Sequence, residues 1–364
     1  MKSIAIWSEP PLPNESQNEL HINYWELPSK GKKTTTGGFI TFIDFGLKIN
    51  KLKSEGSINF LFPFIFDKKA IIPLNSACCD VKVACAIFNE NYSISNSAIE
   101  KFHKFQLDKN NNFYFYELSE SNFSVKTAER DKSVTKMQIK FPKNMPTDAS
   151  SIYVRFRLLT NRLQGLSSFE PLTNAPFQKI ISKVETIDFR INDLRDIGIE
   201  LNEETLASRS FYKFNKLHFF FMCASQRELT LSNRDWVNCR YLENCIWDTY
   251  LEGIEHNARH ILAYHWKCKP DTNEQSFTLL IKSLVEFTDR KLLVGYGILS
   301  VFVGIIIGCA SNYTYECIKN VCSKSKGPIS NVLSSEKPLS EFSSKDNASN
   351  CLQNLKTNLP SSKH

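Results

Sequence analysis

The sequence predicts an α+β protein in which a mainly antiparallel, sandwich-like β region precedes a C-terminal α/β segment and one transmembrane helix. Three observations predict this fold class. Short stretches that alternate apolar and polar residues, separated by turn residues, recur through residues 1–190. A strand, helix and strand pattern follows over residues 191–275. An uncharged apolar run then occupies residues 292–310 and is long enough to cross a bilayer.

The β-rich domain is predicted over residues 1–190. Its expected strands are bounded by turn-forming residues and cover residues 21–27, 39–49, 58–66, 81–88, 112–118, 136–141 and 151–158. Pro63 interrupts the third of these, which indicates an edge strand or a bend because proline cannot donate a ladder hydrogen bond. No long helical period precedes about residue 190, so packed antiparallel sheets are favoured.

The α/β segment is predicted over residues 191–275, packed on or beside the β-rich domain. Residues 217–222 are almost entirely apolar and predict a buried strand. Apolar residues at helical spacing predict a helix over 236–250, which Gly253 ends. Residues 261–266 predict a further strand.

A second helix is predicted over residues 276–291, immediately before the apolar run. Its large apolar side chains recur at helical spacing and are Phe277, Leu280, Ile281, Leu284 and Val285. The sequence therefore predicts an amphipathic helix that leads into the membrane span.

The run over residues 292–310 is predicted to be a transmembrane helix. At about 1.5 Å per residue it would be about 28 Å long, close to the hydrocarbon thickness of a bilayer. The alternative is a buried hairpin in a soluble core. Gly304 and Gly308 form a GxxxG pair, which lets two helices approach closely, although so short a motif also arises by chance. Helix–helix contact and self-association are expected at this pair.

The residues after the span, 311–364, are rich in Ser, Asn and Lys and predict a disordered tail. Positive charges flank both ends of the span, so the positive-inside rule gives a tie. Residues 1–8 reach Glu9 and Pro10 before a signal-peptide core of adequate length has formed. We therefore expect a single-pass protein with a cytosolic, reduced N-terminal domain; the chain has 11 cysteines in all.

The net charge of +7 is modest and spread along the chain, which argues against nucleic-acid binding. The expected partners are the lipid bilayer through residues 292–310, a second copy of the chain, and an unidentified protein or small-molecule ligand. No GxSxG or HExxH motif is present. Asp44-Phe45-Gly46 matches the kinase tripeptide in letters only, because no glycine-rich loop precedes it. No catalytic residue and no cofactor are predicted.

A weak candidate metal site combines His256, His260, His265 and Cys268. Histidine and cysteine are the usual zinc ligands, and His256 and His260 would share one face of a helix. Gly253 has already ended that helix, however, and no pair has the CxxC spacing. Core or surface histidines are the better interpretation.

Two functions from different classes remain. The favoured function is a non-enzymatic, membrane-anchored binding, sensing or effector module with a cytosolic β-rich domain, in signalling or cellular defence. Its support is the architecture together with the missing catalytic motifs. The alternative is a membrane-tethered hydrolase or nuclease whose site is built from scattered residues.

Overall fold

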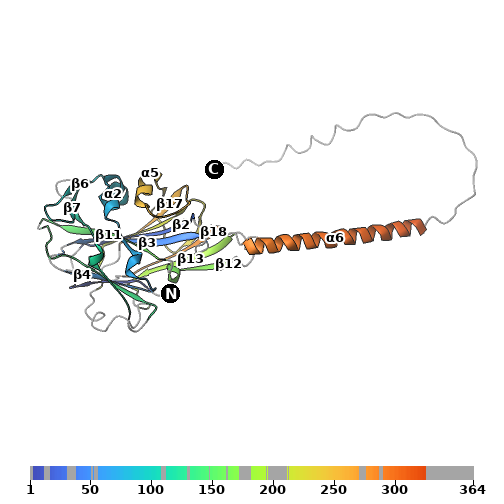
Figure 1. Cartoon of the computed structure of the whole chain (residues 1–364), viewed down its shortest axis with the longest axis horizontal. Coiled ribbons are helices and arrows are strands. Elements are labelled where there is room, and N and C mark those ends of the chain that lie inside the picture. The colour runs from blue at the N-terminus through green and yellow to red at the C-terminus, as the bar shows by residue number, and fades with distance from the viewer. Residues whose placement is uncertain are drawn as a thin grey trace, which may run out of the picture. The chain divides into compact units, whose positions relative to one another are not determined.

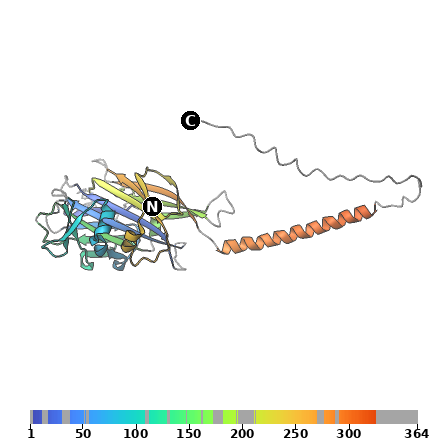
Figure 2. The same cartoon turned by 90° about the horizontal axis from the view of Figure 1, so that it is seen from above.

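The computed structural model shows mostly antiparallel and mixed β-sheets with a few helices and one long apolar helix near the C-terminus (Figures 1 and 2). Two compact units divide at Gly295 and Tyr296. The described residues are 3–324 without 12–16, 31–37, 51, 53–55, 108–111, 129–131, 147, 161–162, 172–181, 194, 196–210, 212, 270–275 and 287–289.

The largest sheet has ten strands, of which nine lie in the order β16-β17-β14-β2-β3-β11-β8-β7-β6 and β5 also pairs with β11. The pairs β14/β2 and β11/β8 are parallel, whereas the other pairs in this sheet are antiparallel. The strand bounds are β2 Glu19–Pro28, β3 Phe39–Asn50, β5 Ile71–Pro73, β6 Ser93–Asn96, β7 Phe102–Gln106, β8 Asn112–Tyr116, β11 Ser151–Leu159, β14 Lys216–Ala224, β16 Asn238–Tyr241 and β17 Ile261–Cys268.

Two four-stranded sheets, β1-β4-β10-β9 and β12-β13-β18-β15, share a core with the large sheet. Phe45 of β3 contacts Phe60 of β4, and Phe189 of β13 contacts Phe219 of β14, with ring centroids 5.6 and 4.9 Å apart. The bounds are β1 Ala5–Glu9, β4 Ser57–Phe62, β9 Phe123–Thr127, β10 Thr135–Lys140, β12 Ser167–Pro171, β13 Ser182–Ile191, β15 Glu228–Ser232 and β18 Phe277–Glu286.

Helices cover the other face of the large sheet. In Figure 1, α2 and α5 lie on one side of β2, β3 and β11, and β4 lies on the opposite side. Trp247 of α5 packs on Trp25 of β2 with ring centroids 5.8 Å apart, and Val83 and Ala84 of α2 belong to the same apolar cluster. The helix bounds are η1 Lys68–Ala70, α1 Asn75–Cys79, α2 Val81–Phe88, η2 Glu120–Asn122, η3 Leu163–Gly165 and α5 Asn244–Tyr250.

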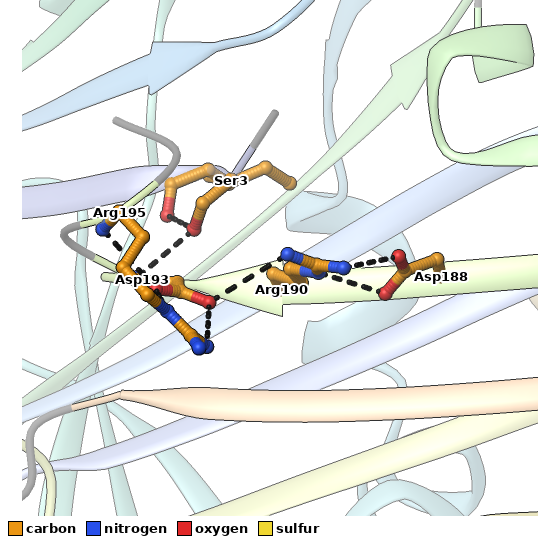
Figure 3. A network of polar contacts seen from close by, with 6 residues as sticks. Ser3, Asp188, Arg190, Asp193 and Arg195 are labelled. Atoms are coloured by element: carbon orange, nitrogen blue, oxygen red, sulfur yellow. Dashed lines mark hydrogen bonds and ion pairs between the residues drawn. The ribbon is translucent and has the colours of Figure 1, made fainter. Parts of the chain in front are cut away.

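A polar network holds the start of the described chain against the end of β13 (Figure 3). The backbone N–H of Asp193 donates to Ser3 Oγ at 3.1 Å, and Asp193 is paired with Arg195 at 2.9 Å and with Arg190 at 3.7 Å. Arg190 also binds Asp188 at 2.7 Å. This network connects the segment that leads into β1 to the sheet that contains β13.

Alternating or strand-length apolar segments predicted eight of the 18 strands among the described residues. Seven of the eight, β2, β3, β8, β10, β11, β14 and β17, coincide with the predicted segments within a few residues. The third predicted strand is shorter than expected. It is β4, which ends at Phe62 because Pro63 follows.

The predicted strand over residues 81–88 is wrong, because Val81–Phe88 is the helix α2. The Asp80 side chain accepts a hydrogen bond from the Val83 N–H at 3.0 Å and caps the helix. Val83, Ala84, Ile87 and Phe88 face the core together, whereas Val81 is exposed. An eight-residue apolar run fits a short helix as well as a strand, and the cap decides between them.

The predicted amphipathic helix over 276–291 is also wrong over most of its length. Residues 277–286 form β18, in which buried Phe277, Leu279 and Ile281 alternate with less buried residues. The segment also satisfies helical spacing, because Leu280 and Leu284 on the second face are apolar too. Pairing with β13 and β15 on both sides imposes the strand.

The helix expected over residues 236–250 is shorter and begins later than predicted. Residues 238–241 form β16, which pairs with β17, and α5 covers only Asn244–Tyr250. Strands β14, β16 and β17 share the large sheet with β2 and β3.

The apolar run lies in α6, Arg290–Lys324, which is longer than the predicted span. Its segment Leu293–Val321 is long and apolar enough to cross a membrane, and none of the apolar window is buried by other parts of the chain. Residues 311–324 are helical, whereas the rest of the predicted tail lies outside the described residues. Gly304 and Gly308 have open space around them, and helix–helix contact there stays a prediction.

Candidate ligand-binding cleft

A cavity of about 550 Å³ lies on the helix-covered side of the large sheet. Its floor is built from β2, β3, β11, β14, β16 and β17, and its walls come from α5 and the C-terminal end of α2. This volume is within the range of sites that bind small molecules. The cavity is the candidate functional site.

Strand geometry explains why polar residues gather on this floor, since every second side chain of a strand points to the same face. The residues that alternate towards the cavity are Glu19, His21 and Asn23 of β2, Lys216, His218 and Phe220 of β14, and Ala263, His265 and Lys267 of β17. The parallel register places His218 directly beside His21. Three histidines that are far apart in the sequence therefore meet on one surface.

One row of residues runs straight across five strands: Lys267, His218, His21, Gly46 and Arg155 are successive register partners. Gly46 is required in this row. A Cβ atom there would overlap the hydroxyl of Tyr153 and lie 3.0 Å from Arg155 Nη1. The missing side chain therefore makes room for the polar groups beside it.

Arg155 is the most unusual residue of the cleft because it is only 1% exposed. Its Nε donates to the Tyr250 hydroxyl and its Nη1 to the Tyr153 hydroxyl, both at 2.8 Å. The buried Nη2 has no hydrogen-bond partner among the described residues. An unsatisfied buried donor costs about 1–3 kcal/mol, so an acceptor supplied from the cavity would be bound favourably.

The nearby carboxylate of Asp44 is already occupied. It accepts hydrogen bonds from Arg157 Nε at 2.7 Å, from the Tyr250 hydroxyl at 2.7 Å and from Trp25 Nε1 at 2.8 Å. Among the described residues, the two buried guanidinium groups of Arg155 and Arg157 are therefore linked to one buried carboxylate, Arg157 directly and Arg155 through the Tyr250 hydroxyl. The excess positive charge favours an anion in the cleft.

The three histidines form a close polar array. His218 Nδ1 lies 3.0 Å from His265 Nε2, and the His21 and His218 rings meet edge to face at 5.0 Å. Burial, followed by neighbouring positive charge, lowers the pKa of His218 to about 3 and the pKa of His265 to about 4. Burial also lowers the pKa of His21. At neutral pH each ring is uncharged and offers one donor and one acceptor.

Charged residues at the cavity are mostly cations. The lining contains Lys48, Arg155, Lys216, Arg240 and Lys267, against the carboxylates Glu19 and Glu90. Burial alone would raise the pKa of Glu19, but its hydrogen bond with His21 and the charges of Lys48 and Lys216 hold that pKa well below its usual range. Glu19 is thus ionised, and the cavity as a whole stays positive.

The lining also contains apolar and aromatic side chains, and Phe220 stacks on His265 with ring centroids 4.2 Å apart. Phe88 and Tyr92 come from the end of α2 and the following segment, and Phe220, Met222 and Trp247 complete this group. Trp247 Nε1 is a second buried donor that has no hydrogen-bond partner among the described residues. A ligand with an anionic end and an apolar or planar body would match both kinds of lining residue.

Of the four residues of the predicted metal site, His265 lies in the cleft and the other three lie outside its lining. His256 forms an isolated bridge with Ser29, and His260 lies edge-on to Tyr241 with ring centroids 6.1 Å apart. Cys268 ends β17 and lies 3.9 Å from Arg234 Nη1. A metal site at these four residues stays a prediction.

Sequence reasoning overlooked His21, Arg155 and His218 as site residues. Each is a polar residue at an inward position of a strand that is otherwise strongly apolar. Buried polar residues of this kind are usually paired, so they carry information about function or stability. That signal was present in the sequence, but it does not show which residues share a face of the folded sheet.

The cleft is interpreted from its own residues. No protein-family model matches the chain, and no curated protein matches it in sequence.

Proposed function

We propose that this protein is a single-pass, membrane-anchored binding or sensing module whose β-rich domain captures a small anionic ligand. The observation that carries the proposal is the buried guanidinium of Arg155, whose Nη2 has no hydrogen-bond partner among the described residues and which lines a cation-rich cavity. Arginine is the preferred side chain for binding carboxylate and phosphate groups. The proposal places the anionic group of the ligand beside Arg155.

The proposed ligand is a phosphate- or carboxylate-bearing molecule with an apolar or planar body. Because two donor atoms of Arg155 already bind tyrosine hydroxyls, the anion receives one bond from Nη2 and further bonds from neighbouring histidines or lysines. The body would lie against Phe88, Phe220 and Trp247. A volume of about 550 Å³ supports a molecule of this size.

The anchor in this proposal is α6, and the domain before it faces the cytosol. Nine cysteines of the described residues are free, which fits a reducing compartment. A sandwich-like packing of the sheets and self-association through Gly304 and Gly308 belong to the same proposal. The contact between Phe45 and Phe60 across two sheets supports the packing.

Binding is tested with the full chain purified in detergent and titrated with inorganic pyrophosphate or a nucleoside triphosphate. Ligand at about 100 times its Kd would stabilise the fold by about 2.7 kcal/mol, which is measurable as a rise in the unfolding temperature. Arg155→Met should weaken binding at least about tenfold, because one lost charge-assisted hydrogen bond is worth about 1.5–3 kcal/mol. At the same ligand concentration it should therefore reduce the stabilisation to about half or less.

Arg195→Met is the matched control, because it removes the same charge from an exposed side chain outside the cavity lining. Equal stabilisation of Arg155→Met and the parent chain would refute the proposed site. The anchor is tested separately by an alkaline carbonate wash of membranes. A chain ending at Arg290 should leave the pellet, whereas the full chain stays in it.

A further inference from the structure

A second cluster of reactive side chains lies outside the lining of the cleft. Cys79 ends α1, His103 lies in β7 and Glu117 follows β8, and one ligand atom of each lies within 4.8 Å of the other two. Strands β7 and β8 are antiparallel neighbours, and the Glu117 N–H donates to the Lys101 carbonyl at 2.8 Å. Regular backbone pairing therefore positions two of the three side chains.

Both ring nitrogens of His103 have defined neighbours. Nδ1 lies 3.0 Å from Asn96 Oδ1, and Nε2 lies 2.8 Å from Glu117 Oε1. When Nδ1 carries the proton and donates it to Asn96, the lone pair of Nε2 is directed at the Glu117 carboxylate. Two acceptors facing each other repel, unless a proton or a metal ion lies between them. An outer hydrogen bond of this kind is typical of metal-binding histidines.

Cys79 adds a third, softer donor to this pair. Cys79 is partly buried, and its Sγ lies within 4.8 Å of the ligand atoms of both other residues. A bound divalent metal would displace the thiol proton, because the thiolate is the form that coordinates metals.

We propose that Cys79, His103 and Glu117 form a binding site for a divalent transition-metal ion such as Zn²⁺, with water in a fourth position. A thiolate, an imidazole and a carboxylate are the three ligand types that zinc uses in proteins. Zinc–ligand bonds of about 2.0–2.3 Å in a tetrahedron separate neighbouring donor atoms by about 3.3–3.7 Å. The half-exposed Glu117 side chain can move back from His103 by the small distance required. This inference does not rest on the proposed function of the cleft.

The test uses the full chain in detergent, reduced and freed of metal with a chelator, and titrated with Co²⁺. A thiolate ligand gives a sulfur-to-cobalt charge-transfer band in the near ultraviolet. One Co²⁺ per chain, this band, and its disappearance on addition of Zn²⁺ are the expected results. Cys79→Ser should remove the band, and Cys85→Ser, which alters another half-buried cysteine nearby in the chain, should not.

His103→Gln and Glu117→Gln should each weaken Co²⁺ binding at least about tenfold. Asn96→Ala leaves all three ligands in place and should weaken binding by about 10- to 100-fold, because it removes the outer partner of His103. This variant keeps the test decisive if a ligand variant fails to fold. Arg155→Met should leave Co²⁺ binding unchanged, so failure of the cleft proposal and failure of this one are distinguishable.

The inference is overturned if the parent chain shows no charge-transfer band. It is also overturned if the band survives Cys79→Ser, or if affinity is unchanged by His103→Gln, Glu117→Gln and Asn96→Ala together. If affinity were unchanged in those three variants, Cys79 would bind the metal alone, without His103 and Glu117 as further ligands.

Discussion

Two buried arginine clusters lie on opposite faces of the large sheet and differ in their charge balance. On the cleft face, Arg157 binds Asp44 directly, and Arg155 is linked to the same carboxylate only through the Tyr250 hydroxyl. On the other face, Arg227 alone binds two carboxylates, with Nη1 2.7 Å from Glu26 Oε1 and Nη2 in contact with Glu185. The first cluster has one carboxyl group for two guanidinium groups, whereas the second has two carboxyl groups for one guanidinium group.

This difference separates a binding role from a structural one. Arg227 forms ion pairs with both carboxyl groups and donates from Nε to Ser283 Oγ at 2.9 Å, although its Nη1 makes no hydrogen bond of good geometry among the described residues. All four side chains of this cluster are buried. Arg155 Nη2 has no hydrogen-bond partner among the described residues, and Arg155 lines a cavity. We therefore propose a structural role for Arg227 and a ligand-binding role for Arg155.

The largest effect is expected for Arg227→Met. The substitution leaves Glu26 and Glu185 buried without their partner, and removing one partner of a buried ion pair costs about 3–5 kcal/mol. Denaturant unfolding of the full chain in detergent measures the loss. Arg155→Met removes two hydrogen bonds to tyrosine hydroxyls but leaves Asp44 paired with Arg157, so it should lower the free energy of unfolding by a smaller amount, about 1–3 kcal/mol. Comparable losses in both variants would contradict the distinction between the clusters.

An intermediate effect is expected for Gly46→Ala. The added methyl group would meet the Tyr153 ring and Arg155 Nη1, and overpacking of this kind costs about 1–3 kcal/mol. It would also displace Arg155, so pyrophosphate binding should weaken together with stability. Gly165→Ala is the control, because its added Cβ would approach only the Pro63 carbonyl, at 3.4 Å. Undiminished binding in Gly46→Ala would show that the position of Arg155 is not critical.

The smallest expected effect is on the pH dependence of stability, which should have opposite signs for buried groups on the two faces of the large sheet. The pKa values of His218 and His265 are about 3 and about 4 in the folded protein, below the unfolded value of about 6.5. The unfolded chain therefore binds more protons between about pH 4 and 6.5, and stability falls as the pH falls through that window. Because both rings are partly exposed, the loss is modest.

Glu26 gives the reverse trend. Burial raises its pKa and outweighs the attraction of Arg227, so the stability that Glu26 contributes is present at low pH and lost as the pH rises through the folded value. Unfolding temperatures measured from pH 4 to 8 should fall towards low pH (the acid arm) and also towards high pH (the alkaline arm). His218→Gln should reduce the fall in the acid arm, and Glu26→Gln should reduce the fall in the alkaline arm. An acid arm that is unchanged in His218→Gln would contradict the assignment.

Local sequence patterns were sufficient for two kinds of element. The apolar helix follows from uninterrupted hydrophobicity, and β2, β3 and β11 follow from period-2 alternation or apolar runs of strand length. The predictions failed where the spacing of the apolar residues fits a strand and a helix equally well. Residues 81–88 became a helix through the Asp80 cap, and residues 277–286 became a strand through pairing on both edges.

The sequence by itself determined the β-rich class, the membrane-compatible helix and the presence of polar residues within apolar strands. Only the tertiary structure decided which of those residues form a site. His21 and His218 are neighbours because β14 lies parallel to β2, and Arg155 reaches Tyr250 across 95 positions of the chain. Strand order and register result from packing over the whole core. The alternation within a single strand does not specify which strand lies beside it.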